Sequence, residues 1–189
     1  MREKIKSLLK NSIAVKQEIL KKYSSLIEKI AQTIIDCYRN NKKVVLFGNG
    51  GSAADSQHIA CELVGRFKKD REPLPAIALT TDTSILTALT NDYSFDSVFA
   101  RQVEALVEKD DVVIAITTSG NSLNVIKGVE SAIKKGARVV VLTGSNGGKI
   151  KNMVEDVLIV PSKDTPNIQE AHITIGHILC QLVEEELFS

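Results

Sequence analysis

The chain is 189 residues long, of which 43% are hydrophobic and 25% charged, a balance typical of a globular protein with one substantial core. Its 24 basic and 23 acidic residues leave a formal net charge of +1. Bulk charge therefore does not recruit a polyanion, and we expect no nucleic-acid partner.

The sequence also contains no membrane or secretory signal. No apolar stretch approaches the roughly 20 residues of a membrane span, and the charged N-terminus lacks an apolar signal region. The three cysteines (Cys37, Cys61 and Cys180) are odd in number, widely spaced and set among apolar residues, which indicates reduced thiols. We expect a cytoplasmic protein without a membrane partner.

The first predicted element is helical. Residues 3–41 contain neither Gly nor Pro, and apolar residues recur mostly at spacings of three, four and seven from Ile5 to Ile34. This periodicity predicts one long amphipathic helix, or two helices broken near Lys22–Ser25. Because the helix precedes the first predicted strand, we expect residues 1–41 to be an extension that packs on another chain and is used in oligomerisation.

After this extension, short β-branched runs alternate with helical segments. The predicted strands are 44–47, 76–79, 112–116, 139–142 and 157–160, and the predicted helices are 52–66, 84–90, 94–107, 123–135 and 167–187. Strands that are apolar on both faces and alternate with helices indicate a parallel sheet covered on both sides. With no repeat or linker, residues 1–189 are expected to form a single α/β domain.

Two loops between these elements are suited to binding an anion. The loop after the first strand reads GNGGS, and the loop after the third reads TTSGNS. Ligands of such sheets bind beyond the carboxyl ends of the strands, and N–H groups with hydroxyls at a helix N-terminus can hold a phosphate without lysine. The same residues also act as ordinary helix caps. Two such loops at neighbouring strand ends favour a phosphorylated small molecule.

A nucleotide cofactor is disfavoured. Gly48, Gly50 and Ala53 fit a loose G-x-G-x-x-A pattern, which in a dinucleotide site is followed about 20 residues later by an acid that ends the second strand. Asp70 and Glu72 lie at that distance, but in a charged loop ahead of the strand. No G-K-[ST] follows the glycines, so a P-loop is excluded as well.

The chain has three histidines, and their spacing predicts a titratable site. His58 and Glu62, four residues apart, share one face of the helix after GNGGS; such a pair can bind a metal, join a base to its partner, or be an ordinary surface pair. His172 and His177 should face different sides of the last helix, so one is expected in the core. A carboxylate and a histidine suffice for aldose–ketose isomerisation through an enediolate.

Five segments, taken together and in order, resemble the sedoheptulose 7-phosphate isomerases, also called phosphoheptose isomerases, of the sugar isomerase (SIS) domain family. They are GNGGSAADSQHIACELVGRF, LTTDTSILTALTNDYSFDSVFARQVEAL, TTSGNSLNVIKG, VLTGSNGGKI and IQEAHITIGHIL. The likeness runs from Val44 to Leu187. It implies a flavodoxin-like, three-layer α/β/α sandwich with a five-stranded parallel sheet, and a homotetramer with active sites between subunits.

The resemblance also implies an activity and its residues. The reaction is the conversion of sedoheptulose 7-phosphate to D-glycero-D-manno-heptose 7-phosphate through an enediol, the first step toward the heptose of lipopolysaccharide or capsule. Glu62 would be the general base and His177 its acid–base partner. Substrate contacts are implied for Asn49, Gly50, Gly51, Ser52, Asn91, Asp92, Thr118, Ser119, Asn121, Ser122 and Gln169.

Zinc, one ion per subunit, is implied as a cofactor on His58, Glu62, Gln169 and His177. Gln169 and His177 are eight residues apart, about 12 Å along a straight helix. Both can reach one metal only if the helix is distorted, with Gly176 as the weak point, or if the site draws on two chains.

The sequence departs from the family at two positions, and an alternative function remains. Asn167 stands where members often have Arg, and Thr117 replaces a serine while keeping the hydroxyl. The alternative is a non-catalytic SIS module, a phosphosugar-sensing or replication-initiator-binding adaptor that keeps the phosphate loops. Retention of both Glu62 and His177 favours the enzyme.

Overall fold

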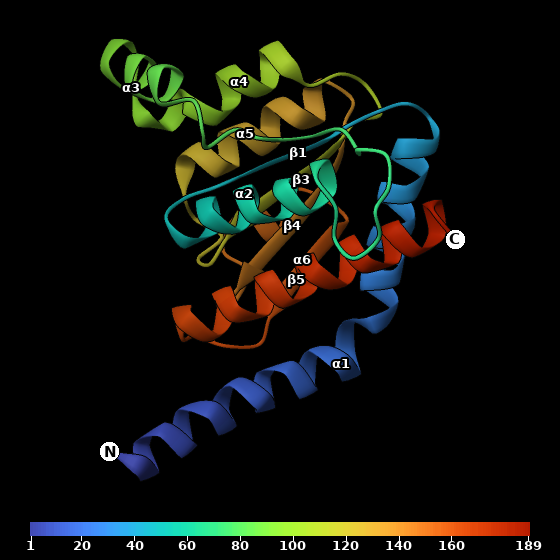
Figure 1. Ribbon diagram of the computed structural model, residues 1–189. Coiled ribbons are helices and arrows are strands. Elements are labelled where there is room, and N and C mark those ends of the chain that lie inside the picture. Colours follow the sequence, from blue (N-terminus) through green and yellow to red (C-terminus); the bar gives the residue numbers. More distant parts are fainter.

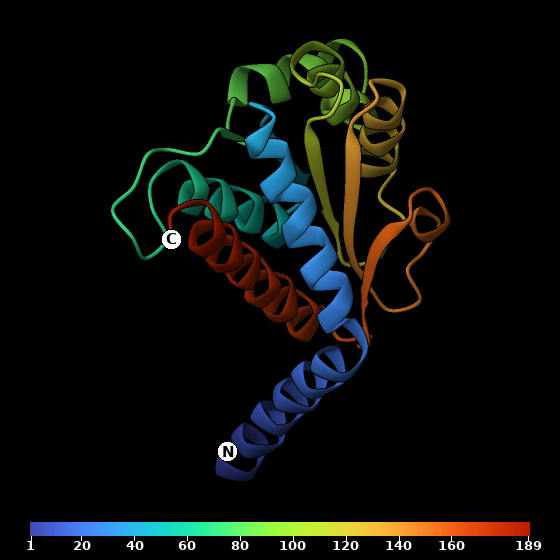
Figure 2. The same cartoon turned by 90° about the vertical axis from the view of Figure 1, so that its right-hand side faces the viewer.

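The computed structural model describes residues 1–189 and has a central parallel sheet with helices on both faces (Figures 1 and 2). The sheet has the order β2-β1-β3-β4-β5, and every neighbouring pair of strands is parallel. The strands are β1 (Val44–Gly48), β2 (Ala76–Ala78), β3 (Val112–Thr117), β4 (Arg138–Gly144) and β5 (Asp156–Val160). The predicted three-layer fold with five parallel strands is confirmed.

Six α-helices surround the sheet. They are α1 (Arg2–Arg39), α2 (Gly51–Val64), α3 (Thr83–Asp92), α4 (Val98–Leu106), α5 (Leu123–Lys134) and α6 (Thr165–Leu187), with the short 3₁₀ helices η1 (Phe95–Ser97) and η2 (Ile150–Asn152). The segment predicted as one helix over 94–107 is divided between η1 and α4. None of the helices combines the length and hydropathy needed to cross a bilayer.

Two hydrophobic cores lie on opposite faces of the sheet. Val44 and Leu46 of β1 point into the core shared with α1, α2 and α6, whereas Val45 and Phe47 point into the core shared with α4 and α5. This division follows from the two-residue period of a strand, which sends successive side chains to opposite faces. It explains why the strand sequences are apolar throughout.

The strand order places the site. The chain moves outward from β1 to β2 and then returns to β3, so the order reverses between β1 and β3, which pair directly from Val44↔Val112 to Gly48↔Ile116. A crevice forms at the carboxyl ends of strands where the order reverses. The loops GNGGS and TTSGNS therefore lie side by side, as the sequence predicts.

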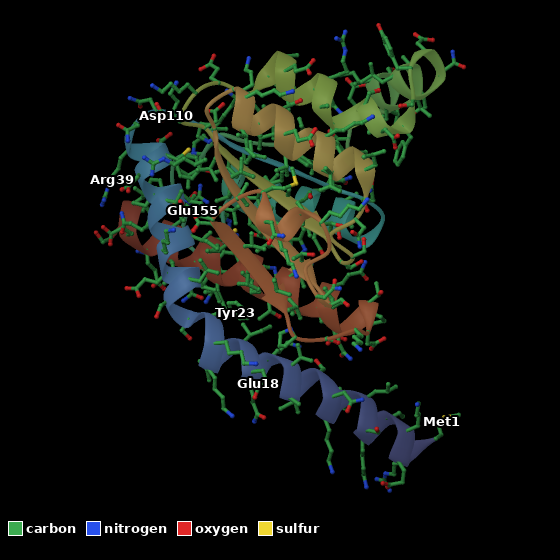
Figure 3. All side chains as sticks on the ribbon, turned by 180° about the vertical axis from the view of Figure 1, so that it is seen from behind. Met1, Glu18, Tyr23, Arg39, Asp110 and Glu155 are labelled. Carbon is green, nitrogen blue, oxygen red and sulfur yellow. The ribbon has the colours of Figure 1, made fainter.

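Helix α1 is a single helix that bends beside Tyr23, within the segment where a break is one of the two predicted outcomes (Figure 3). The Ser24 hydroxyl donates to the Leu20 carbonyl at 2.6 Å, and a bond of this kind bends helices without ending them. Beyond the bend, Ile27, Ile30 and Ile34 are buried in the chain's own core. The expectation that the whole stripe packs on another chain is therefore wrong for this half of the helix.

The first half of α1 projects away from the domain (Figures 1 and 2). Ile5, Leu8, Leu9 and Ile13 are each at least half exposed. Ser12 and Lys16 hydrogen-bond to Glu170 at the start of α6, and Val15 and Ile19 pack against the core of the domain. The arm therefore presents an apolar stripe that this chain alone leaves uncovered.

Candidate active site

The loop after β1 leads directly into the N-terminus of α2. Gly50 has a φ of +57°, a left-handed conformation that favours glycine, and no side chain caps the start of the helix. Ser52 is buried in the first turn. The Asn49 amide exchanges two hydrogen bonds of 2.9 Å with the Asn124 amide on α5, which ties this loop to the next one. An uncapped helix N-terminus attracts an anion.

The loop after β3 is preorganised by its own polar groups. The Thr117 hydroxyl accepts from the backbone N–H of Gly120, and the Ser119 hydroxyl accepts from the N–H of Asn121. Gly120 has a φ of +66°, and Ser122 begins α5 without a side-chain cap. Thr118 precedes this turn at the end of β3. The two uncapped helix starts thus flank one crevice.

A third loop, TGSNGG after β4, packs against the TTSGNS loop and holds it in place. The N–H groups of Lys149 and Ile150 donate to the Asn121 side chain and the Gly120 carbonyl. A Cβ atom on Gly120 would collide with the Gly147 carbonyl, and one on Gly148 would collide with the Ser119 carbonyl. The glycines of TGSNGG therefore allow the close contact that fixes the shape of the TTSGNS loop.

Helices α2 and α6 bring the titratable residues together. His58 Nε2 lies 3.2 Å from Glu62 Oε1 and 3.3 Å from His177 Nε2, and all three side chains offer ligand atoms within 4.8 Å of one another. Gly176 makes this possible, because a Cβ atom there would collide with Ile59 on α2. The missing side chain lets the two helices approach and sets His177 beside His58.

The other histidine of α6 belongs to the core. His172 is fully buried, and its Nε2 lies 3.1 Å from the Thr143 carbonyl, to which the neutral ring donates. Burial lowers its pKa to about 4, only partly offset by that hydrogen bond. The prediction that one histidine of this helix is a core residue is confirmed, and His177 is the one that faces Glu62.

Gln169 lies at the other end of the α2–α6 contact. Its amide packs against Gly51, where a Cβ atom would collide with it. Helix α6 continues without a break through Gly176, so Gln169 stays two helical turns from His177. Within one chain, the structure thus groups His58, Glu62 and His177, and places Gln169 beside the GNGGS loop.

Asn91 and Asp92 are exposed at the end of α3 and bond to each other at 2.8 Å. Helix α3 has no buried residue and packs mainly on η1 and α4 (Figure 1). The structure therefore does not bring these two residues together with Glu62 or His177 in the same chain.

Asp55 is a polar residue beside His58 that sequence reasoning missed. Its Oδ2 atom is buried without a hydrogen-bond partner, one turn before His58 on α2. Burial raises its pKa to about 6, and nearby His58 offsets this only in part. Its spacing of three and seven residues from His58 and Glu62 was the available signal.

The crevice, its two uncapped helix starts and the His–Glu–His group define a class of protein, the sugar isomerase domain proteins. The model of that family, described as SIS domain, matches residues 8–144. A relative from Aquifex aeolicus (strain VF5), named phosphoheptose isomerase, is 57% identical, and the match spans 98% of this chain and 97% of the relative. A relative from Geobacter sp. (strain M21), with the same name, is 55% identical, and the match spans 100% of this chain and 98% of the relative. The chain belongs to the phosphoheptose isomerase family and is an isomerase.

Solved structures agree in fold. A phosphoheptose isomerase from Neisseria gonorrhoeae has a TM-score of 0.92 at 43% identity, covering 97% of this chain and 98% of that one. A phosphoheptose isomerase from Francisella tularensis has a TM-score of 0.94 at 41% identity, covering 97% of each chain. The likeness extends over nearly the whole chain, including most of the helical extension.

Proposed function

We propose that this chain converts sedoheptulose 7-phosphate to D-glycero-D-manno-heptose 7-phosphate, with Glu62 as the general base and His177 as its acid–base partner. The observation that carries the proposal is that α2, whose N-terminus lines the crevice suited to phosphate, also brings Glu62 together with His177 of α6. Relatives more than 50% identical are named phosphoheptose isomerase. The product would supply heptose for lipopolysaccharide or capsule, made in the cytoplasm.

The reaction needs two proton movements. Glu62 removes the proton from the carbon next to the carbonyl, and returns it to the neighbouring carbon. His177 moves the proton between the two oxygens of the enediolate. A positioned base and acid contribute about 10²–10⁴-fold each to such a step. No redox cofactor or covalent nucleophile is required.

We place the phosphate between the two uncapped helix starts, on Gly50, Gly51, Ser52 and the segment Thr118–Ser122. The support is electrostatic: backbone N–H groups and hydroxyls meet there, at the positive ends of α2 and α5. Gln169, beside Gly51, and Asn49 would contact the sugar. Asn91 and Asp92 would do so only from a second chain, since α3 leaves them exposed.

We propose zinc as a cofactor, one ion per subunit, held by His58, Glu62 and His177. A tetrahedral zinc with bonds of about 2.0–2.1 Å separates its ligand atoms by about 3.4 Å, and the two closest pairs here lie 3.2 and 3.3 Å apart. Gln169 would complete the set only from another chain or after α6 distorts. Held there, zinc would supply Lewis-acid stabilisation of a substrate oxygen, and Glu62 would be a weaker base while it holds the ion, so the two roles would compete.

The metal proposal predicts that purified protein carries about one zinc per chain and that His58→Ala carries much less. Elemental analysis before and after chelation measures this directly. Activity followed in the same samples should change on chelation, because Glu62 is released. Wild-type protein that never takes up zinc would leave Glu62 and His177 acting alone and return His58 to a structural role.

We also propose a homotetramer with active sites between subunits, built by one domain of residues 1–189. The first half of α1 leaves its apolar stripe exposed, and an apolar groove of about 530 Å³ lies between α1 and α6. Surfaces of this kind mark interfaces. The exposed positions of Asn91 and Asp92 also favour a site completed by a neighbour.

The decisive experiment is incubation of pure protein with sedoheptulose 7-phosphate, followed by NMR. The aldose phosphate should accumulate to equilibrium. A protein that binds the sugar phosphate without converting it would be the non-catalytic adaptor, the alternative that keeps the phosphate loops.

A further inference from the structure

A buried ion pair joins the segment after α2 to helix α6. Arg71 Nε lies 3.1 Å from Glu184 Oε2, and both side chains are only 2% exposed. Arg71 belongs to the charged run FKKDREP, residues 67–73, a composition typical of a solvated loop. In the structure, however, the Arg71 guanidinium is buried and donates to the carboxylate of Glu184, 113 residues away in the sequence.

Glu184 gathers the loop through three further hydrogen bonds. Its two oxygens accept from the backbone N–H groups of Phe67, Lys68 and Lys69 at 3.0, 2.8 and 2.9 Å. Burial pulls the pKa of Glu184 upward, but these donors and Arg71 outweigh it, so the pKa lies below its ordinary value. One ionised carboxylate therefore fixes the backbone of residues 67–69.

Arg71 completes the end of the helix that carries the general base. Its Nη2 donates to the Glu62 carbonyl and its Nη1 to the Leu63 carbonyl, both at 2.9 Å. The last carbonyls of a helix have no partner within the helix, and a cation there also opposes the helix dipole. The guanidinium thus contacts the backbone of Glu62 itself.

The loop that Glu184 holds also contacts His177, the other proposed catalytic side chain. The Phe67 ring lies 5.6 Å from the His177 ring, centroid to centroid, at 34°. Glu184 is seven residues beyond His177, two turns further along the same face of α6. The Arg71–Glu184 pair therefore supports both members of the proposed acid–base pair, Glu62 through the Arg71 guanidinium and His177 through Phe67.

We propose that Arg71 and Glu184 are positioning residues for the isomerisation: together they set α2 against α6 and hold Phe67 on His177, so that Glu62 and His177 meet in a reactive arrangement. This rests on the proposed roles of Glu62 and His177. Neither Arg71 nor Glu184 touches substrate in this arrangement. They act on the catalytic residues indirectly, by positioning the C-terminal parts of α2 and α6.

The test compares Glu184→Gln with a matched control, a second buried carboxylate that lies outside α2 and α6. Asp111 is also fully buried, accepts the N–H groups of Lys43 and Glu108, and pairs with Lys43 Nζ at 2.8 Å, just before β3. Removing either charge leaves buried donors unpaired and lowers stability. Only Glu184 contacts the helices of the site.

We expect Glu184→Gln to lower kcat by about 10–100-fold, the scale of a misplaced catalytic group, with KM changed less than about 3-fold because the phosphate loops are untouched. Asp111→Asn should lose thermal stability yet keep kcat within about 2-fold, with both measured well below Tm. Glu184→Asp, which keeps the carboxylate, should recover part of the lost kcat. Equal kcat losses in Glu184→Gln and Asp111→Asn would overturn the proposal.

A second measurement does not depend on activity. The chain has three histidines, so the imidazole NMR signals can be assigned by substitution. Glu184→Gln and Arg71→Lys should shift the His177 ring signals, which Phe67 shields, and leave those of His172 unchanged. Unchanged His177 signals in both variants would contradict the proposal. Wild-type activity in Glu62→Gln would instead refute the assignment of Glu62 as the base. That result is distinguishable from failure of the positioning proposal.

Discussion

Glu62 and His177 are 115 positions apart in the sequence, and a single missing side chain brings them together. Because Gly176 has no Cβ atom, Ile59 can pack directly on the backbone of α6, and His58 then lies within 3.3 Å of His177. His172, on the opposite face of α6, is neutral and buried. The same helix therefore carries one histidine that packs in the core and one that belongs to the proposed catalytic group.

His172 gives a pH prediction. Its folded pKa of about 4 lies below the ordinary value of 6.5, so the unfolded chain binds the extra proton more readily between these values. The stability that neutral His172 contributes is complete above pH 6.5 and is lost as the pH falls toward 4. The loss is roughly 3 kcal/mol at pH 4, at about 1.4 kcal/mol per pKa unit.

His172→Gln, which keeps a donor for the Thr143 carbonyl, should flatten this dependence. Tm measured from pH 7 to pH 5 should fall more steeply in the wild type than in the variant, since all other titrating groups are shared. Parallel curves would show that His172 does not govern this loss.

At the scale of elements, the sequence predicted what has a local periodic signal. The strands are apolar on both faces because two cores lie against them, so each of the five was predicted to within two residues at either end. The loops GNGGS and TTSGNS were predicted as neighbours because parallel strands end at one edge. These features depend on residues close together in the chain.

Contacts between distant residues have no such signal. The Arg71–Glu184 pair spans 113 positions, and nothing in FKKDREP distinguishes a buried arginine from a solvated one. The separation of Gln169 from His58 depends on α6 staying straight through Gly176, which spacing alone left open. The bend of α1, likewise, depends on one serine hydroxyl bonding to Leu20.

The α2–α6 contact predicts an effect of Gly176→Ala. The added Cβ atom would collide with Ile59 and push α6 away from α2, although alanine favours helix by about 1 kcal/mol over glycine. Activity should fall at least about 10-fold, because a displacement of about 1 Å can cost about 100-fold.

The double variant Gly176→Ala, Ile59→Val tests the cause. Valine removes Cδ1, the nearer of the two Ile59 atoms that the new Cβ would meet, so kcat should recover in part relative to Gly176→Ala alone. If Ile59→Val gives no recovery, crowding between these two helices is not the reason for the loss.

At the scale of the whole molecule, α1 has two parts with different surroundings. Residues beyond the bend belong to the core of the chain, whereas the first half carries exposed Ile5, Leu8, Leu9 and Ile13. Removing all of α1 would therefore destroy the core. Removing residues 2–16 should spare most of the core and delete the exposed apolar stripe proposed to join subunits, together with the Ser12 and Lys16 bonds to Glu170.

This truncation should convert the tetramer to smaller species with lower activity, measured by light scattering after size-exclusion chromatography. The Tm of the remaining core should stay measurable, since Ile27 to Tyr38 are retained. A truncated chain that still forms a fully active tetramer would move the interface elsewhere, for instance to α3.

Isomerisation of sedoheptulose 7-phosphate in D₂O, followed by NMR, tests most directly whether Glu62 takes the substrate proton. Wild-type protein should form the aldose phosphate and place solvent deuterium on the carbons that exchange the proton. Glu62→Gln, which keeps the shape of the side chain without its basicity, should be slower by about 10²–10⁴-fold in both conversion and exchange while it remains folded. Conversion by Glu62→Gln at the wild-type rate would contradict the account.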